Sequence, residues 1–126
     1  AEDYESLLRA HVPPADDIAG ALVSSRIPRL DLVLLGMGAD GHTTSLFSGT
    51  AALDERDRLV VRNEVPQLNM QRVTMTFPLI NAARERWFLV SGADKAAAFA
   101  RVQAGELPAG RVRDAALYVN PAVIGT

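Results

Sequence analysis

The chain has 126 residues, 48% of them hydrophobic, with a formal net charge of −2 and no cysteine. This length allows one domain at most. The slightly acidic balance gives no electrostatic reason to bind nucleic acid or an anionic membrane, and the lack of cysteine excludes disulfides, thiolate metal sites and cysteine nucleophiles. No apolar run approaches the ~20 residues of a transmembrane helix, and the first residues do not resemble a signal peptide.

The first third of the chain predicts two helices and a buried strand. Apolar residues recur at helical spacing over residues 1–10. An aspartate at position 16 or 17 can cap a second helix that runs to about residue 24. Residues 30–35 (LDLVLL) form a nearly continuous apolar run followed by glycine, which is typical of a strand buried on both faces of a parallel sheet.

A glycine-rich turn over residues 36–42 follows this strand, and residues 43–47 are expected to begin one or two helical turns. Beyond them strands and helices alternate. The expected strands cover 59–65, 72–77, 86–91 and 116–119, and the expected helices cover 79–84 and 94–103. This alternation implies an α/β fold with a mostly parallel sheet and flanking helices.

The turn contains the spacing G-x-G-x-x-G at Gly36, Gly38 and Gly41. It is expected at the carboxyl edge of the sheet, where ligands of α/β proteins bind. A dinucleotide site would place Asp40 against the pyrophosphate, and the phosphate loop of a nucleoside triphosphatase would need a lysine where His42 stands. Both interpretations are therefore disfavoured.

A third interpretation makes His42 the reactive group. Its imidazole can take a proton from water near neutral pH, Asp40 could orient the ring or contact a sugar hydroxyl, and exposed N–H groups of the turn can stabilise an oxyanion. The alternative is that His42 only caps the helix expected after it. Asp40 and His42 could also begin a metal site, although no third ligand is suggested nearby.

Two basic residues stand where an anionic substrate could be held. Arg72 begins the strand over 72–77, and Lys95 lies in the first turn of the helix over 94–103; it is the only lysine among the 13 lysines and arginines. A helix N-terminus favours a bound phosphate and disfavours a cation that has no anion beside it. The alternative is that both are solvated surface charges.

Two blocks of the sequence resemble one enzyme family. LDLVLLGMGADGHTTSLFSG resembles the signature of the 6-phosphogluconolactonases, and RVTMTFPLINAARERWFLVSGADKA resembles the block that follows it in that family. The resemblance covers about residues 30–102. It implies a modified Rossmann-like fold of the sugar-phosphate isomerase type. The implied activity is hydrolysis of 6-phospho-D-glucono-1,5-lactone to 6-phosphogluconate in the oxidative pentose phosphate pathway, by a cytoplasmic enzyme without a metal or organic cofactor.

The resemblance assigns roles to a catalytic pair and a substrate-binding set. The catalytic pair is His42, as the general base that activates water, and Asp40 beside it. The substrate-binding set is Gly36, Gly38, Gly41, Arg72 and Lys95, of which the last two would hold the phosphate.

Two other functions remain open. The related glucosamine-6-phosphate deaminases carry a glutamate for ring opening five residues after the histidine, where this chain has Phe47, which cannot transfer protons. Sugar-phosphate-sensing domains of transcription regulators resemble the same fold and bind effectors without catalysis.

The resemblance also places residues 1–126 in the C-terminal half of a single domain about twice as long. We expect the N-terminal half to be absent from this chain and to act as its partner by completing the pocket. Without it the sheet should expose an edge and an apolar face. Such a fragment could be inactive alone.

Overall fold

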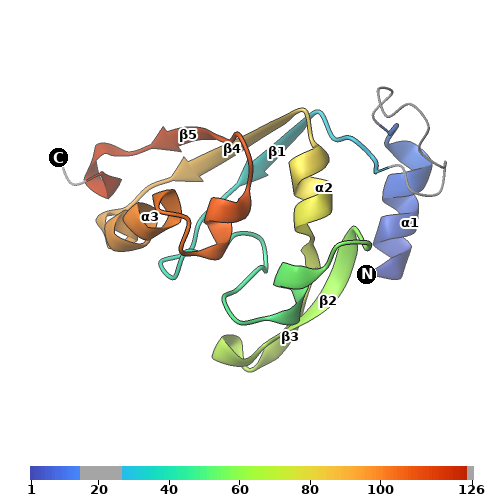
Figure 1. Ribbon diagram of the computed structural model, residues 1–126, viewed down its shortest axis with the longest axis horizontal. Coiled ribbons are helices and arrows are strands. Elements are labelled where there is room, and N and C mark those ends of the chain that lie inside the picture. Colours follow the sequence, from blue (N-terminus) through green and yellow to red (C-terminus); the bar gives the residue numbers. More distant parts are fainter. Residues whose placement is uncertain (15–26, 125–126) are drawn as a thin grey trace.

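In a computed structural model, the described part of the chain, residues 1–14 and 27–124, forms three α-helices and five strands (Figure 1). The second helix expected near residues 16–24 lies outside the described residues. The helices and strands are α1 (Glu2–His11), β1 (Leu32–Leu35), β2 (Val60–Val65), β3 (Met70–Met75), α2 (Phe77–Ala82), β4 (Glu85–Val90), α3 (Ala96–Gln103) and β5 (Ala116–Val119), with short 3-10 turns between some of them. The strands β1, β2 and β3 follow one another without an α-helix between them.

Three of the strands form a parallel sheet in the order β1-β4-β5. The register pairs Leu35 with Phe88 and Val90 with Val119. Alternate residues of β1 and β4 are buried in the main core, where they pack with Phe99 of α3. This parallel sheet with flanking helices confirms the α/β fold class. α3 and the β2–β3 hairpin lie on one side of the sheet in Figure 1.

The other face of this sheet is apolar and uncovered among the described residues. Leu34 of β1 is 59% exposed, and Leu89 of β4 and Tyr118 of β5 are each 52% exposed. Leu89 and Tyr118 are partners in the register, so their side chains lie on the same face. The exposed apolar face expected from the sequence is therefore present.

The strands β2 and β3 form a separate antiparallel hairpin. The turn between them is shorter than the gap between the strands expected over 59–65 and 72–77. A 3-10 turn over Pro66–Leu68, followed by Asn69 in the left-handed conformation (φ 48°), reverses the chain at once. β3 accordingly begins at Met70 and ends at Met75, and α2 begins at Phe77, two residues earlier than expected.

The helical turns expected over residues 43–47 were wrong. Thr43 and Leu46 form an isolated antiparallel bridge instead, and Thr44 between them has a positive φ of 51°. The Thr43 hydroxyl donates to the Gly36 carbonyl at 2.8 Å. Side-chain hydrogen bonds of this kind compete with helix formation. No helix follows directly after His42, so its alternative role as a helix cap is also wrong.

Buried Arg86 stabilises the junction between α2 and β4. Its guanidinium donates to the carbonyls of Asn81 at 3.1 Å and Arg113 at 2.6 Å, and also to that of Ala83. Carbonyls at the end of α2 thus accept hydrogen bonds from a guanidinium. A positive charge at this position also interacts favourably with the negative end of the helix dipole. α2 ends at Ala82, two residues before the expected boundary.

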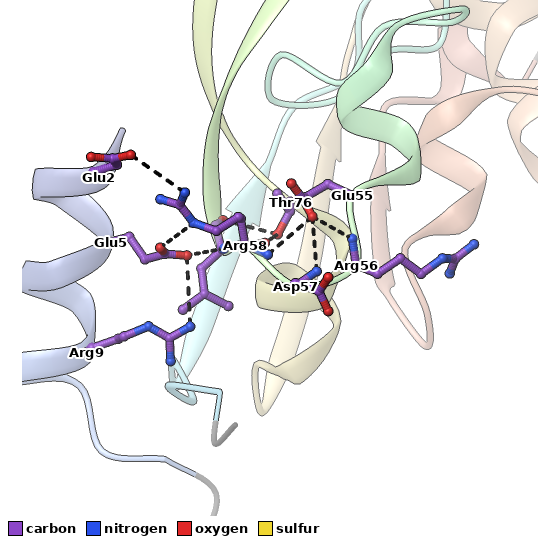
Figure 2. Close-up of polar contacts among 9 residues, drawn as sticks. Glu2, Glu5, Arg9, Glu55, Arg56, Asp57, Arg58 and Thr76 are labelled. Carbon is purple, nitrogen blue, oxygen red and sulfur yellow. Dashed lines mark hydrogen bonds and ion pairs between the residues drawn. The ribbon is translucent and has the colours of Figure 1, made fainter. Parts of the chain in front are cut away.

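α1 is joined to the start of β2 by a buried carboxylate. Glu5 of α1 is 8% exposed and accepts hydrogen bonds from the Leu59 backbone N–H and, at 2.7 Å, from Arg58 Nε (Figure 2). Arg9 lies 4.0 Å from the same carboxylate. Burial acts to raise the pKa of Glu5, but the hydrogen bonds and the two arginines outweigh it and lower the pKa. None of the helices in residues 1–14 and 27–124 is long and apolar enough to cross a membrane.

Candidate active site

The turn over residues 36–42 and the segment that leads into α3 meet at one edge of the parallel sheet. β1 and β4 are parallel neighbours, so the residues after Leu35 and after Val90 leave the sheet at its carboxyl edge. Lys95 lies at the N-cap of α3, at the end of a 3-10 turn, and its Nζ donates to the Met37 carbonyl at 2.9 Å. The only lysine of the sequence is therefore hydrogen-bonded to the glycine-rich turn.

His42 and Asp40 form a direct pair within this turn. The Nδ1 atom of His42 lies 2.5 Å from Oδ1 of Asp40, and the His42 backbone N–H donates to the same oxygen at 3.2 Å. Since a carboxylate only accepts hydrogen bonds, Nδ1 must carry the proton, and the lone pair of a neutral ring is then on Nε2. The His42 side chain is 29% exposed and can reach a ligand.

The charge state of Asp40 supports this arrangement. Partial burial acts to raise the pKa of its carboxyl, but the hydrogen bonds from the ring and the backbone of His42 outweigh burial and lower the pKa. Asp40 is therefore ionised at neutral pH and holds the ring through Nδ1. Among the described residues no group of three His, Asp or Glu side chains is placed to hold a metal ion.

Two of the three glycines are required by close contacts. A Cβ on Gly38 would lie 2.1 Å from both Nδ1 and Cε1 of the His42 ring, so a side chain there would displace the imidazole. Gly41 has a φ of +80°, and a Cβ on it would lie 2.5 Å from Leu107. A Cβ on Gly36 would meet nothing within 4 Å; its carbonyl accepts the bond from Thr43.

Arg72 reaches the loop that leaves His42 rather than His42 itself. It lies exposed on β3, and its Nε donates to Oγ of Ser45 at 3.3 Å. The structure thus places Asp40 and His42 on one turn, brings Lys95 into contact with that turn, and sets Arg72 against the segment that follows it. Lys95 reaches the turn from the start of α3, and Arg72 reaches the segment after the turn from the hairpin.

Sequence reasoning missed the residues that hold the loop over 43–50 in place. Asn63 of β2 is buried and donates to the Ser45 carbonyl at 2.8 Å and to Thr50 Oγ1 at 3.0 Å. Thr74 of β3 accepts a hydrogen bond from the Ser45 N–H at 3.1 Å. Both are polar residues at inward positions of short strands, which was a signal in the sequence, although their partners could not be read from it.

Phe47 is the other residue whose position was not foreseen. Its ring stacks on the His42 imidazole with the centroids 4.0 Å apart and the planes 19° apart. In the sequence, Phe47 is notable only through the resemblance, which implies a glutamate at this position in the related deaminases. Because the phenyl ring is in contact with the imidazole, this position belongs to the site.

Comparison with known protein families shows which family the chain belongs to. The family described as "Glucosamine-6-phosphate isomerases/6-phosphogluconolactonase" matches residues 1–119. The chain belongs to this family. The resemblance seen in the two sequence blocks is therefore confirmed over most of the chain.

Relatives within the family share the name 6-phosphogluconolactonase. The protein of that name from Chlamydia muridarum is 51% identical over 94 residues, which cover 75% of this chain and 32% of the relative. The one from Rattus norvegicus is 39% identical over 117 residues, covering 90% of this chain and 42% of the relative.

A solved family structure, "Crystal structure of 6-phosphogluconolactonase from Leishmania guyanensis", superposes on the chain with a TM-score of 0.82 and 27% identity, and the match covers 99% of this chain but 51% of that one. The chain spans about a third to a half of the length of these relatives.

Proposed function

We propose that this chain carries the catalytic residues of a 6-phosphogluconolactonase, with His42 as the general base. The observation that carries the proposal is the His42–Asp40 pair in a turn at the carboxyl edge of the sheet, with Lys95 bound to the same turn. The names of the family relatives supply the substrate class, a phosphorylated sugar lactone.

The reaction begins with water attacking the C1 carbonyl of the lactone. Nε2 of His42 accepts a proton from the water as the oxygen bonds to C1, and Asp40 stabilises the imidazolium through Nδ1. The carbonyl electrons move to oxygen, giving a tetrahedral oxyanion. When this intermediate collapses, the bond from C1 to the ring oxygen breaks, and the leaving oxygen takes the proton back from Nε2. The product is the open-chain acid, which loses its carboxyl proton to solvent to give 6-phosphogluconate.

Lys95 and Arg72 are assigned to the phosphate. An ammonium has three N–H donors, and the Met37 carbonyl accepts from Lys95, so the same group can donate to phosphate oxygens as well. Arg72 donates through Nε to Ser45 and through one terminal nitrogen to Met70 Sδ, and its remaining N–H groups are suited to a second phosphate contact. With the phosphate on C6 held in this way, the position of the lactone relative to His42 would be fixed.

The proposal includes a further polypeptide segment that covers the exposed face of the parallel sheet and completes the pocket. The uncovered apolar face of the parallel sheet includes Leu34, Leu89 and Tyr118. The unmatched part of these family relatives is about half of their length or more. A segment equivalent to that unmatched part would cover this face and complete the pocket, in an enzyme of the cytoplasm.

Substrate comparison tests the proposal. The protein is assayed with 6-phosphogluconolactone and, separately, with glucosamine 6-phosphate, both alone and mixed with the unmatched part of a family relative. We expect hydrolysis of the lactone and no ammonia from the amino sugar, because Phe47 cannot transfer a proton. Ammonia release would favour the deaminase, and binding of sugar phosphates without turnover would favour a sensing domain.

A further inference from the structure

Phe47 contacts the proposed base directly, and the reaction described above does not use it. Its ring lies 4.0 Å from the imidazole of His42, centroid to centroid, with 19° between the planes. The phenyl side chain is nearly fully buried, at 4% exposure for the residue, whereas His42 is half-buried. The stack therefore joins a partly exposed ring to a ring that is almost completely buried.

The position of Phe47 is fixed by the hairpin. Its carbonyl accepts hydrogen bonds from the Thr50 hydroxyl at 2.7 Å and from the Thr50 N–H at 3.3 Å. Asn63 of β2 in turn donates to the same hydroxyl. A continuous series of contacts thus runs from β2 through Thr50 and Phe47 to the imidazole.

Asp40 alone would not fix the orientation of the imidazole. A single hydrogen bond through Nδ1 leaves the ring free to rock about the bonded atom, and Asp40 itself is exposed. The phenyl ring lies against a face of the imidazole, and Gly38 lies close to its Nδ1 and Cε1 atoms. Nε2 takes part in none of these contacts, so it is the ring nitrogen assigned to the substrate.

We infer that Phe47 is a positioning residue that sets the plane and the tautomer of His42, an assignment that rests on the proposed role of His42 as the base. Stacking holds Nδ1 on Asp40, and this keeps the lone pair of the neutral ring on Nε2. A phenyl ring neither accepts nor donates a proton, so His42 is the group of the stacked pair that can move protons.

Nuclear magnetic resonance of the imidazole nitrogens tests this inference without requiring catalysis. The protein has two histidines, so the signals of His42 are assigned by comparison with His42→Gln. In the neutral ring of the parent we expect Nδ1 protonated and Nε2 unprotonated. In Phe47→Leu and in Phe47→Met, either of which removes the stacked ring, we expect both nitrogens to shift toward the average of two tautomers. Phe47→Tyr should restore the parent spectrum.

A matched control is Phe77→Leu, which removes another buried phenyl ring, at the start of α2. It should leave the His42 spectrum unchanged. In lactone hydrolysis, Phe47→Leu should lower kcat by about 10- to 100-fold with KM within a factor of about two, since misplacing a reacting group costs rate more than binding.

The two proposals can fail separately. If the parent hydrolyses the lactone and Phe47→Leu keeps both the parent tautomer and the parent kcat, the role of Phe47 is overturned. The same holds if Phe77→Leu changes the tautomer as much as Phe47→Leu does. If the tautomer depends on Phe47 but the protein has no lactonase activity with or without the completing segment, the positioning role stands and the proposed function fails.

Discussion

Three different groups restrict one imidazole in the turn over residues 36–42. Asp40 holds Nδ1, Phe47 stacks on the ring, and Gly38 leaves the space that the ring occupies. Each of these contacts limits a different motion of His42. Gly38 is required because a side chain there would strike the His42 ring. Gly41 is required by its positive φ and by its close contact with Leu107.

A methyl group on Gly38 should disturb the His42 ring directly. We expect Gly38→Ala to destabilise the protein by about 1–3 kcal/mol, because an added Cβ must push the ring or the turn aside. Urea unfolding measures the stability. Gly36→Ala is the matched control for folding, since a Cβ there meets nothing within 4 Å. Equal stability of the two variants would contradict the described packing of the ring.

Removing the charge of Lys95 should weaken substrate binding. A hydrogen bond to a charged group contributes about 1.5–3 kcal/mol, so Lys95→Gln should raise KM by about 10- to 100-fold. Steady-state kinetics with the lactone measures this. Arg101→Gln, which removes one positive charge from an exposed pair with Glu106, is the control for net charge. A KM that rises equally in both variants would argue against a phosphate contact at Lys95.

At the scale of elements, the hairpin acts as a support for the loop that leaves His42. Ser45 is buried in that loop, and its N–H and carbonyl are bonded to Thr74 of β3 and Asn63 of β2. The loop has no regular secondary structure of its own, so these side chains supply the hydrogen bonds that a helix would have made. The order of the site thus depends on pairing within the β2–β3 hairpin.

Thr74→Val should loosen this support with little change in volume. It removes the acceptor of the buried Ser45 N–H and the bond to the Thr44 hydroxyl, so we expect a loss of about 1–3 kcal/mol in the free energy of unfolding. Denaturant titration measures it. Val73→Ala, at a neighbouring residue that is 57% exposed, provides the control. An unchanged stability in Thr74→Val would show that the loop is held in another way.

The contact between α1 and β2 should depend on pH through Glu5. Because the folded pKa of Glu5 lies below its unfolded value, the stabilisation is present above about pH 4.3 and is lost as the pH falls through the folded pKa. We expect Glu5→Gln to lower Tm at neutral pH and the difference from the parent to shrink in acid. Asp3→Asn, an exposed residue of the same helix, is the control. A difference that stays constant with pH would contradict the ionised form of Glu5.

Local patterns were sufficient for most elements and not for the loop of the site. Alternation and apolar runs predicted β1, β2, β4 and β5 within two residues, because side-chain periodicity reflects burial directly. The segment over 43–47 was mispredicted because its conformation depends on Thr74 and Asn63, both distant in sequence. The Lys95 contact with Met37 joins residues that are distant in the sequence. The stack of Phe47 on His42 depends on the irregular turn between them. Neither contact could be predicted from local patterns.

At the scale of the whole molecule, the described elements bury one face of the parallel sheet and leave the other apolar and open. The main core packs against the face that carries Val33, Leu35 and Phe88, while Leu34 and Leu89 remain more than half exposed. A contiguous apolar face of this kind marks an interaction site. The proposed completing segment would cover this face, and the unmatched half of the Leishmania guyanensis structure is long enough to supply one.

The central claim, that His42 is the base in lactone hydrolysis, is tested most directly by comparing the parent with His42→Gln. Both are assayed for hydrolysis of 6-phosphogluconolactone above the spontaneous rate, alone and mixed with the unmatched part of a family relative. We predict that the parent in its completed form is active and that His42→Gln is slower by about 10²–10⁴-fold, with folding unchanged by thermal unfolding. Equal rates for the two proteins, or no hydrolysis by the completed parent, would contradict the account.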